Sequence, residues 1–123
     1  MNVNDDSKLE PYQKDSALLR ALSHPVRLAI VDILREGEAC VCHMEAVLDQ
    51  RQAYISQQLS VLKQADLIED HRDGWNVFYR IRDPKIFELV DLSRKIAEGD
   101  PLQKIPLKPK NCPCPKCNPV NKE

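Results

Sequence analysis

Cysteines are the residues of this sequence whose type and spacing point most directly to chemistry. Cys40 and Cys42 are separated by one residue, and Cys112, Cys114 and Cys117 follow near the end of the sequence. No basic stretch followed by an apolar run opens the sequence, so we expect no secretory signal. An odd number of cysteines in such a chain argues against a disulfide framework. The cysteines therefore predict metal binding or redox chemistry.

The one-residue spacing of Cys40 and Cys42 limits how the two can bind one ion together. Each residue of an α-helix turns by about 100°, so the two side chains would lie about 200° apart on a regular helix. Either Cys40 precedes the helix, or binding of the ion distorts the first helical turn. Both arrangements place the thiols at a helix N-terminus, which favours the thiolate form that binds metals.

The other three cysteines lie in a proline-rich segment. Six of the nine prolines lie between Pro101 and Pro119, which predicts an extended chain. At roughly 3.1 Å per residue, the stretch from Gly99 to Cys112 can reach about 40 Å, far enough to meet the first cysteine pair of its own subunit or of a partner. Three sulfur ligands suit trivalent arsenic or antimony, and four suit cadmium, lead or zinc. A separate zinc clip or disorder is the alternative for this tail. The candidate ligands of a composite site are Cys40, Cys42, Cys112, Cys114 and Cys117.

The elements that must position these cysteines can be predicted from hydrophobic periodicity and turn signals. After a flexible segment, residues 1–13, we expect a first helix that begins at Asp15 or Ser16, and a last helix that begins at Asp83-Pro84. A type I′ turn at Asp73-Gly74 should join two strands. This order predicts a mainly α fold with a β-hairpin wing (α+β), a dimeric winged helix-turn-helix, over residues 14–98, followed by a Pro/Cys-rich tail, 99–123. The intervening helices are expected at 25–34, 40–48 and 52–64, and the strands at 67–72 and 75–81.

In such a fold the helix at 52–64 enters the major groove of DNA. Its apolar residues Ile55, Leu59 and Leu62 share one face, and the opposite face is small and polar. Glutamine and serine can read base edges, while Arg51, Lys63 and Arg72 would contact phosphates. The net charge of -1 does not indicate nucleic-acid binding, and the pattern alone fits a protein-interaction module equally well. The candidate DNA contacts are Arg51, Gln52, Tyr54, Ser56, Gln57, Gln58, Ser60, Lys63 and Arg72.

Residues 23–82 resemble the ArsR/SmtB family of metal-responsive repressors at several places in the correct order. Ser23-His24-Pro25-Val26-Arg27-Leu28 is similar to the family's S-x-P-x-R-L, and Cys40-Val41-Cys42 stands where its arsenic- and cadmium/lead-sensing branches carry C-V-C. The stretch 55–62 resembles the recognition helix. Gly74-Trp75 and Tyr79-Arg80-Ile81 resemble the wing.

The resemblance implies a cytoplasmic, DNA-binding repressor rather than an enzyme. Because no 18 apolar residues run together, we also expect no membrane-spanning segment. The resemblance further implies a homodimer formed by the first and last helices, which reads an imperfect inverted repeat of double-stranded operator DNA. The C-V-C motif implies release of the operator by As(III) or Sb(III), with Cd(II), Pb(II) or Zn(II) as alternatives. Another family site, on the last helix, uses aspartate and histidines. Asp91 is present here but that helix has no histidine, so we expect this second site to be absent.

Several features depart from the family pattern or leave alternatives open. Gln57 and Gln58 stand where the family often has histidine or arginine, so the operator sequence cannot be carried over. His43 replaces a common acidic residue after C-V-C. The cysteines could instead form a redox or persulfide switch, or a zinc-stabilised interaction module. A thiol reductase is disfavoured because no Cys-x-x-Cys opens a βαβ unit.

Overall fold

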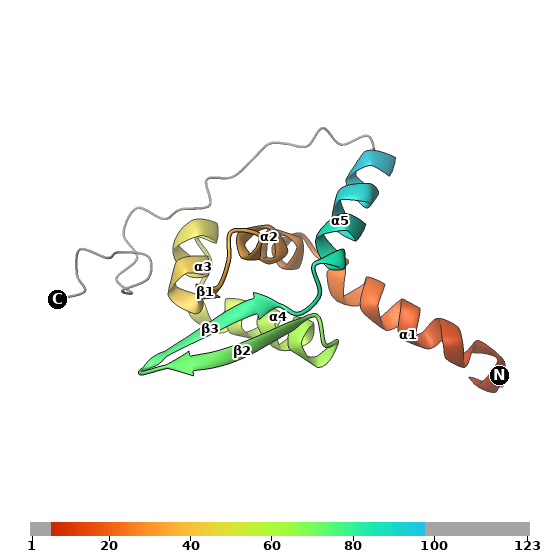
Figure 1. Ribbon diagram of the computed structural model, residues 1–123, viewed down its shortest axis with the longest axis horizontal. Helices are drawn as coiled ribbons and strands as arrows, with labels where there is room; N and C mark the ends of the chain where they lie inside the picture. The colour runs from red at the N-terminus through yellow and green to blue at the C-terminus, as the bar shows by residue number, and fades with distance from the viewer. Residues whose placement is uncertain (1–5, 98–123) are drawn as a thin grey trace.

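Five helices and a small sheet make up the part of the chain that the computed structural model describes, residues 6–97 (Figure 1). The sheet has three antiparallel strands in the order β1-β3-β2. The β2–β3 hairpin extends away from the helices, and α1 and α5 lie toward the side opposite its tip. The expected helical fold with a hairpin wing is thereby confirmed. The elements are α1 (Asp6–Leu22), α2 (Pro25–Leu34), β1 (Ala39–Cys40), α3 (Val41–Leu48), α4 (Gln52–Gln64), β2 (Ile68–Asp73), β3 (Asn76–Ile81) and α5 (Lys85–Ile96).

A single aliphatic core holds these elements together. Helix α2 lies at its centre, since Ile30, Val31 and Ile33 are almost entirely buried. Helix α3 adds Met44, which is also fully buried. Burying one such side chain contributes about 1.5–3 kcal/mol, so the core fixes α3 and α4 firmly. None of the helices within residues 6–97 is long and apolar enough to cross a membrane. The core also receives Ile55, Leu59 and Leu62 from α4, and Leu67 and Ile68 from the start of the wing.

Helix α1 is longer than the sequence pattern predicts. It begins at Asp6 rather than at Asp15 or Ser16, so the expectation of a flexible segment through residue 13 is wrong for residues 6–13. Residues 8–17 are all exposed, and an exposed stretch shows no apolar repeat from which a helix could be recognised. Pro11 within this stretch further hid the helix, because proline disfavours a helix interior.

Strand β1 was not predicted. It consists of Ala39 and Cys40, which pair with Tyr79 and Phe78 of β3. Two residues are too few to show an alternating pattern, and the pairing depends on a strand about forty residues later in the chain. Cys40 has extended backbone dihedrals, φ -93 and ψ 168, and serves as the N-cap of α3, which begins at Val41. The expected helix start at residue 40 is therefore wrong by one residue.

The wing is a regular hairpin with a two-residue turn. Its register runs from Ile68 opposite Ile81 to Asp73 opposite Asn76, so Gly74 and Trp75 form the turn. Gly74 has a φ of 67, and Trp75 is not among the residues with positive φ. This combination of signs matches a type II′ turn, whereas type I′ requires positive φ at both positions. The expected Asp-Gly turn is thus shifted by one residue and is of the other hairpin type.

Candidate DNA-reading surface and thiol pair

Helices α3 and α4 form a helix-turn-helix unit in which α4 is the second helix. Helix α3 ends at Leu48. Its C-cap, Asp49, has φ 56 and ψ 46 in the left-handed region, and its N–H donates to the carbonyl oxygen of Glu45 at 2.7 Å. Gln50 and Arg51 complete the connection to α4. Such a short turn sets two helices at a steep angle and is typical of DNA-binding units.

The outward face of α4 is polar; Lys63 is the one cationic side chain on it within the helix, and Arg51 precedes the helix as its N-cap. Ile55, Gln58, Leu59 and Leu62 are buried, and most of the other positions of the helix face solvent. Amides and hydroxyls dominate that face, and the N–H groups of the first helical turn add a positive end. This arrangement can donate to and accept from base edges and phosphates. We call it the DNA-reading surface; its exposed residues are Arg51, Gln52, Ala53, Ser56, Gln57, Ser60, Lys63 and Gln64.

Two of the predicted DNA contacts lie elsewhere. Gln58 is only 6% exposed, and its Oε1 accepts a hydrogen bond of 2.7 Å from Nη1 of Arg27. Tyr54 is half-buried, with its hydroxyl 3.3 Å from Nε2 of His24. The expectation that Gln58 faces DNA is therefore not met by its position. Its spacing could have shown this, because it follows Ile55 by three residues and precedes Leu62 by four, which places it on the inward face.

The remaining cationic candidates lie at the border of α4 and the wing. Nζ of Lys63 is 3.0 Å from Oδ2 of Asp70 on β2, and the Lys63 side chain is 54% exposed. Arg72 is exposed farther along β2. An exposed ion pair contributes about 0–1 kcal/mol, so a phosphate can replace Asp70 as the partner of Lys63 at little cost.

The thiols of Cys40 and Cys42, called here the thiol pair, converge at the start of α3. Their Sγ atoms are 2.6 Å apart, and both residues are thiols rather than a disulfide. Cys40 is buried and packs on Phe78, while Cys42 is half-buried against the same cluster. Of the two arrangements that the spacing allowed, the structure has the first: Cys40 precedes the helix. Both sulfurs can therefore reach one ion without distortion of the helical turn.

The thiol pair supplies only part of a metal site. Within residues 6–97 no group of three or more histidine, cysteine, aspartate or glutamate side chains is placed to hold a metal ion. Cys112, Cys114 and Cys117 lie outside the described residues. Their share in a composite site therefore stays a prediction.

Asp91, the residue expected to be left over from a second metal site, belongs to an ion-pair network between α2 and α5. Its carboxylate accepts hydrogen bonds from both terminal nitrogens of Arg35, and Arg94 donates to Asp32 at 2.7 Å. Burial by itself would lower the pKa of Arg35, but hydrogen bonds and charges from Asp91 and Asp32 outweigh it and raise that pKa. The network thus joins the last helix to the core helix through two guanidinium groups.

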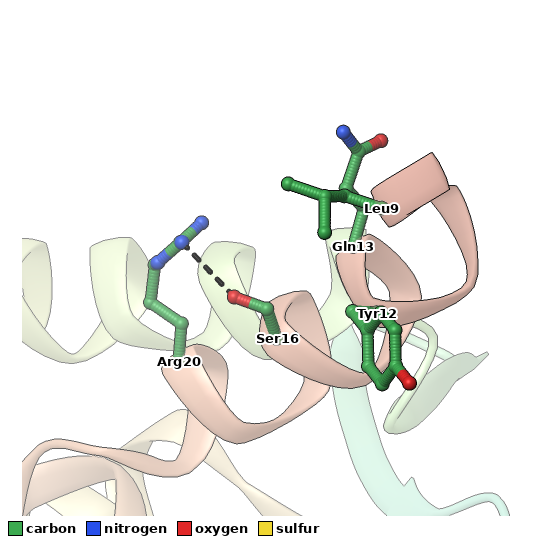
Figure 2. A pocket seen from close by; sticks show the side chains of 5 residues that line it. All are labelled: Leu9, Tyr12, Gln13, Ser16 and Arg20. Carbon is green, nitrogen blue, oxygen red and sulfur yellow. Dashed lines mark hydrogen bonds between the residues drawn. The ribbon is translucent and has the colours of Figure 1, made fainter. Parts of the chain in front are cut away.

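Helices α1 and α5 expose apolar side chains. Leu9, Tyr12 and Leu19 on α1 are each more than half exposed, as are Leu92 and Ile96 on α5. Figure 2 shows a shallow hollow along α1, whose lining residues come from successive turns of that one helix. Within it, Arg20 donates to Oγ of Ser16 at 3.2 Å. Several exposed apolar side chains on one helix are typical of a surface that a partner covers.

Comparisons with known proteins place these features among regulators. Residues 24–70 match the model of the bacterial regulatory protein, arsR family. The biofilm growth-associated repressor of Agrobacterium fabrum is 40% identical over 60% of this chain and 63% of its own length, so the chain spans less than two thirds of that relative. The cadmium resistance transcriptional regulatory protein CadC of Listeria innocua is 36% identical over 68% of this chain and 71% of its own length.

A solved structure shows the same architecture. The homodimeric winged helix-turn-helix DNA-binding domain of a possible ArsR-family regulator from Mycobacterium bovis superimposes with a TM-score of 0.68 and 28% identity, covering 80% of this chain and 91% of that one. These proteins are named as regulators or repressors. That agrees with the expectation that the chain is not an enzyme.

Proposed function

Since the chain belongs to the arsR family of bacterial regulatory proteins, we propose that it is a transcriptional repressor that releases its operator when the thiol pair captures a thiophilic ion. One observation carries the proposal: Cys40 and Cys42 converge at the N-cap and first turn of α3, the first helix of the helix-turn-helix. An ion bound there acts directly on the element that holds α4. A coupling free energy of about 1–3 kcal/mol between ion and operator is enough for a measurable response.

Operator binding is assigned to the DNA-reading surface together with the wing. Gln52, Ser56, Gln57 and Ser60 would meet base edges in the major groove. Arg51, Lys63 and Arg72 would contact phosphates on either side, and the hydroxyl of Tyr54 would support the N-terminal end of α4. The net charge of the chain is -1, so the electrostatic attraction to phosphates would come from these residues and not from the chain as a whole.

The proposed repressor is a homodimer. The apolar faces of α1 and α5 offer a surface that a second copy would bury, and the Mycobacterium bovis neighbour is itself described as homodimeric. Two-fold symmetry then presents two α4 helices to successive major grooves about 34 Å apart. The operator is accordingly an imperfect inverted repeat.

The ion is most readily trivalent arsenic or antimony, held by the thiol pair and at least one sulfur of Cys112, Cys114 or Cys117. Soft thiolates favour such ions, and a third sulfur completes their usual coordination. Cadmium, lead or zinc would take a fourth sulfur, and the Listeria innocua relative is named for cadmium resistance. The bound ion would be held by Cys40 in β1 and by Cys42 in α3. Because Cys40 pairs with Phe78 of β3, it would act on the wing as well as on α3.

A redox switch is the second candidate, favoured by the direct contact between the thiols of Cys40 and Cys42. A peroxide would oxidise both thiols to a disulfide, taking two electrons and two protons and leaving water and an alcohol or a second water. A polysulfide would instead be attacked by one thiolate: its S–S bond would break, its terminal sulfur would stay on the cysteine as a persulfide, and a polysulfide one sulfur shorter would leave with the bonding electrons. Either product would occupy the site that the ion needs.

Operator binding measured by fluorescence anisotropy under reducing conditions tests the proposal. The full chain and a duplex from upstream of its own gene would be titrated with As(III), Sb(III), Cd(II), Pb(II) and Zn(II) in turn, beside Cys40→Ser, Cys42→Ser and Cys112→Ser. We expect one soft ion to release wild type and to leave both variants of the thiol pair bound. Loss of release in Cys112→Ser would add the tail to the site. Tight binding that ignores every ion but yields to peroxide or polysulfide would replace the ion hypothesis with the redox one.

A further inference from the structure

Gln58 is the one buried polar side chain among residues 8–97, and it lies in the middle of the helix that carries the DNA-reading surface. Its Oε1 accepts from Nη1 of Arg27 at 2.7 Å. The same guanidinium donates through Nε to the carbonyl oxygen of Ala21 at 2.6 Å and through Nη2 to that of Arg20 at 3.3 Å. One side chain of α2 therefore bonds the end of α1 and the centre of α4 at once.

The hydrogen bonds of Arg27 have a fixed geometry. The last carbonyl groups of α1 have no partners within the helix, and a cation at a helix C-terminus is electrostatically favoured. A guanidinium is planar and presents its N–H groups in a fixed fork. Because two N–H groups of Arg27 bond carbonyl groups of α1 and one bonds Gln58, the position of Gln58 relative to the end of α1 is fixed.

We propose that Arg27 and Gln58 are positioning residues that set the rotation of α4 relative to α1, and thereby the spacing and angle at which a dimer presents its two DNA-reading surfaces. This inference rests on the proposed function, in which α1 lies in the dimer interface. Ser56, Gln57 and Ser60 project from one helix with fixed angles between them. A small rotation of α4 therefore redirects all three side chains together. In a symmetric dimer any such error occurs twice, once at each half-site.

A purely structural role makes a different prediction. A buried glutamine needs a hydrogen-bond partner wherever it occurs, and removal of that partner lowers stability. Such a role would change the unfolding temperature but would leave the preference of the folded dimer for one half-site spacing intact. Spacing preference is therefore the property that separates the two roles.

The test compares the full-length wild type with Gln58→Met, Gln58→Glu and Arg27→Lys. Each is titrated with the operator and with versions whose half-sites are moved by one base pair, which displaces a half-site by about 3.4 Å and rotates it by about 35°. Binding is followed by fluorescence anisotropy. Circular dichroism and sedimentation confirm that each variant is folded and dimeric at the temperature used.

We expect Gln58→Met to weaken operator binding by at least about fivefold while its preference for the correct spacing falls. Arg27→Lys keeps the charge but loses the fork, so it should relax the spacing preference in the same way. Gln58→Glu keeps an oxygen acceptor opposite Arg27 and should recover most of the preference. If Gln58→Met does not fold, the spacing preference of Arg27→Lys compared with that of wild type tests the proposal.

Variants that melt earlier but keep the operator affinity and spacing preference of wild type would overturn the inference and leave the proposed function standing. Wild type that binds the operator no better than unrelated DNA would overturn both. The two failures are thus distinguishable in one set of titrations.

Discussion

Gln58 and Trp75 invert the usual relation between polarity and burial. Gln58 is 6% exposed, whereas Trp75, at the tip of the wing, is 97% exposed. Hydropathy would place each of them on the opposite side of the surface. Positions that break a local rule are often those where function sets the residue. Both inversions fall on the elements assigned to DNA, one supporting α4 from inside and one projecting from the β2–β3 turn.

Trp75 gives a direct test of the wing, because it is the single tryptophan of the sequence. If the wing lies on the operator, addition of the duplex should quench or shift tryptophan emission in step with the rise in anisotropy. The Trp75→Phe variant supplies the background signal and should change the free energy of unfolding by no more than about 0.5 kcal/mol, since the ring packs on little. Emission that stays constant while anisotropy saturates would show that the wing tip remains off the DNA.

At the scale of elements, the sequence predicts best what the core dictates. The bounds of α4 were predicted because its apolar repeat faces the core, and α2 was predicted because Pro25 begins it and aliphatic residues fill it. Strand β1 and the first half of α1 were missed for a physical reason: one depends on a distant strand, and the other faces no core within its own chain. The two arrangements of the thiol pair were likewise left open by spacing, because only the β1–β3 pairing places Cys40 before the helix.

The joint between α2 and α5 is held by Arg35, which bonds Asp32 and Asp91 and lies 5.0 Å above the ring of Phe87. The Arg35→Met variant loses these ion pairs and the cation–π contact but keeps much of the aliphatic packing. We expect the free energy of unfolding to fall by about 1–2 kcal/mol, because the Arg35 side chain is only 28% exposed.

Urea unfolding measures that change. Arg82→Met is the matched control, because its ion pairs with Asp66 and Glu69 are long, 3.4 and 3.9 Å, and far more exposed. It should alter stability by no more than about 0.5 kcal/mol. Equal effects of the two substitutions would mean that the network does not hold α5 to α2.

At the scale of the whole molecule, the two ends of the described chain both expose apolar side chains. Helices α1 and α5 are the first and last elements of the described part, and they lie toward the side opposite the tip of the wing (Figure 1). Among residues 8–97 they carry five of the six large apolar side chains that are exposed. The sixth is Trp75, at the wing. Under the proposed function, the described domain separates an apolar side, suited to a second copy, from the DNA-reading surface.

A double variant, Leu9→Glu with Tyr12→Glu, tests whether this apolar side makes the dimer, because burying two carboxylates in each copy would cost more than the lost apolar contacts alone. Sedimentation should show a monomer. Operator affinity should then fall by about 100-fold or more, since each half-site is bound without the effective concentration that linkage gives. Lys14→Glu is the control: it also adds negative charge to α1, but it lies about 200° around the helix from Tyr12 and should leave the dimer intact. A double variant that stays dimeric with full operator affinity would show that α1 is not in the dimer interface. The proposed positioning of α4 against α1 would then have no bearing on how the dimer presents its DNA-reading surfaces.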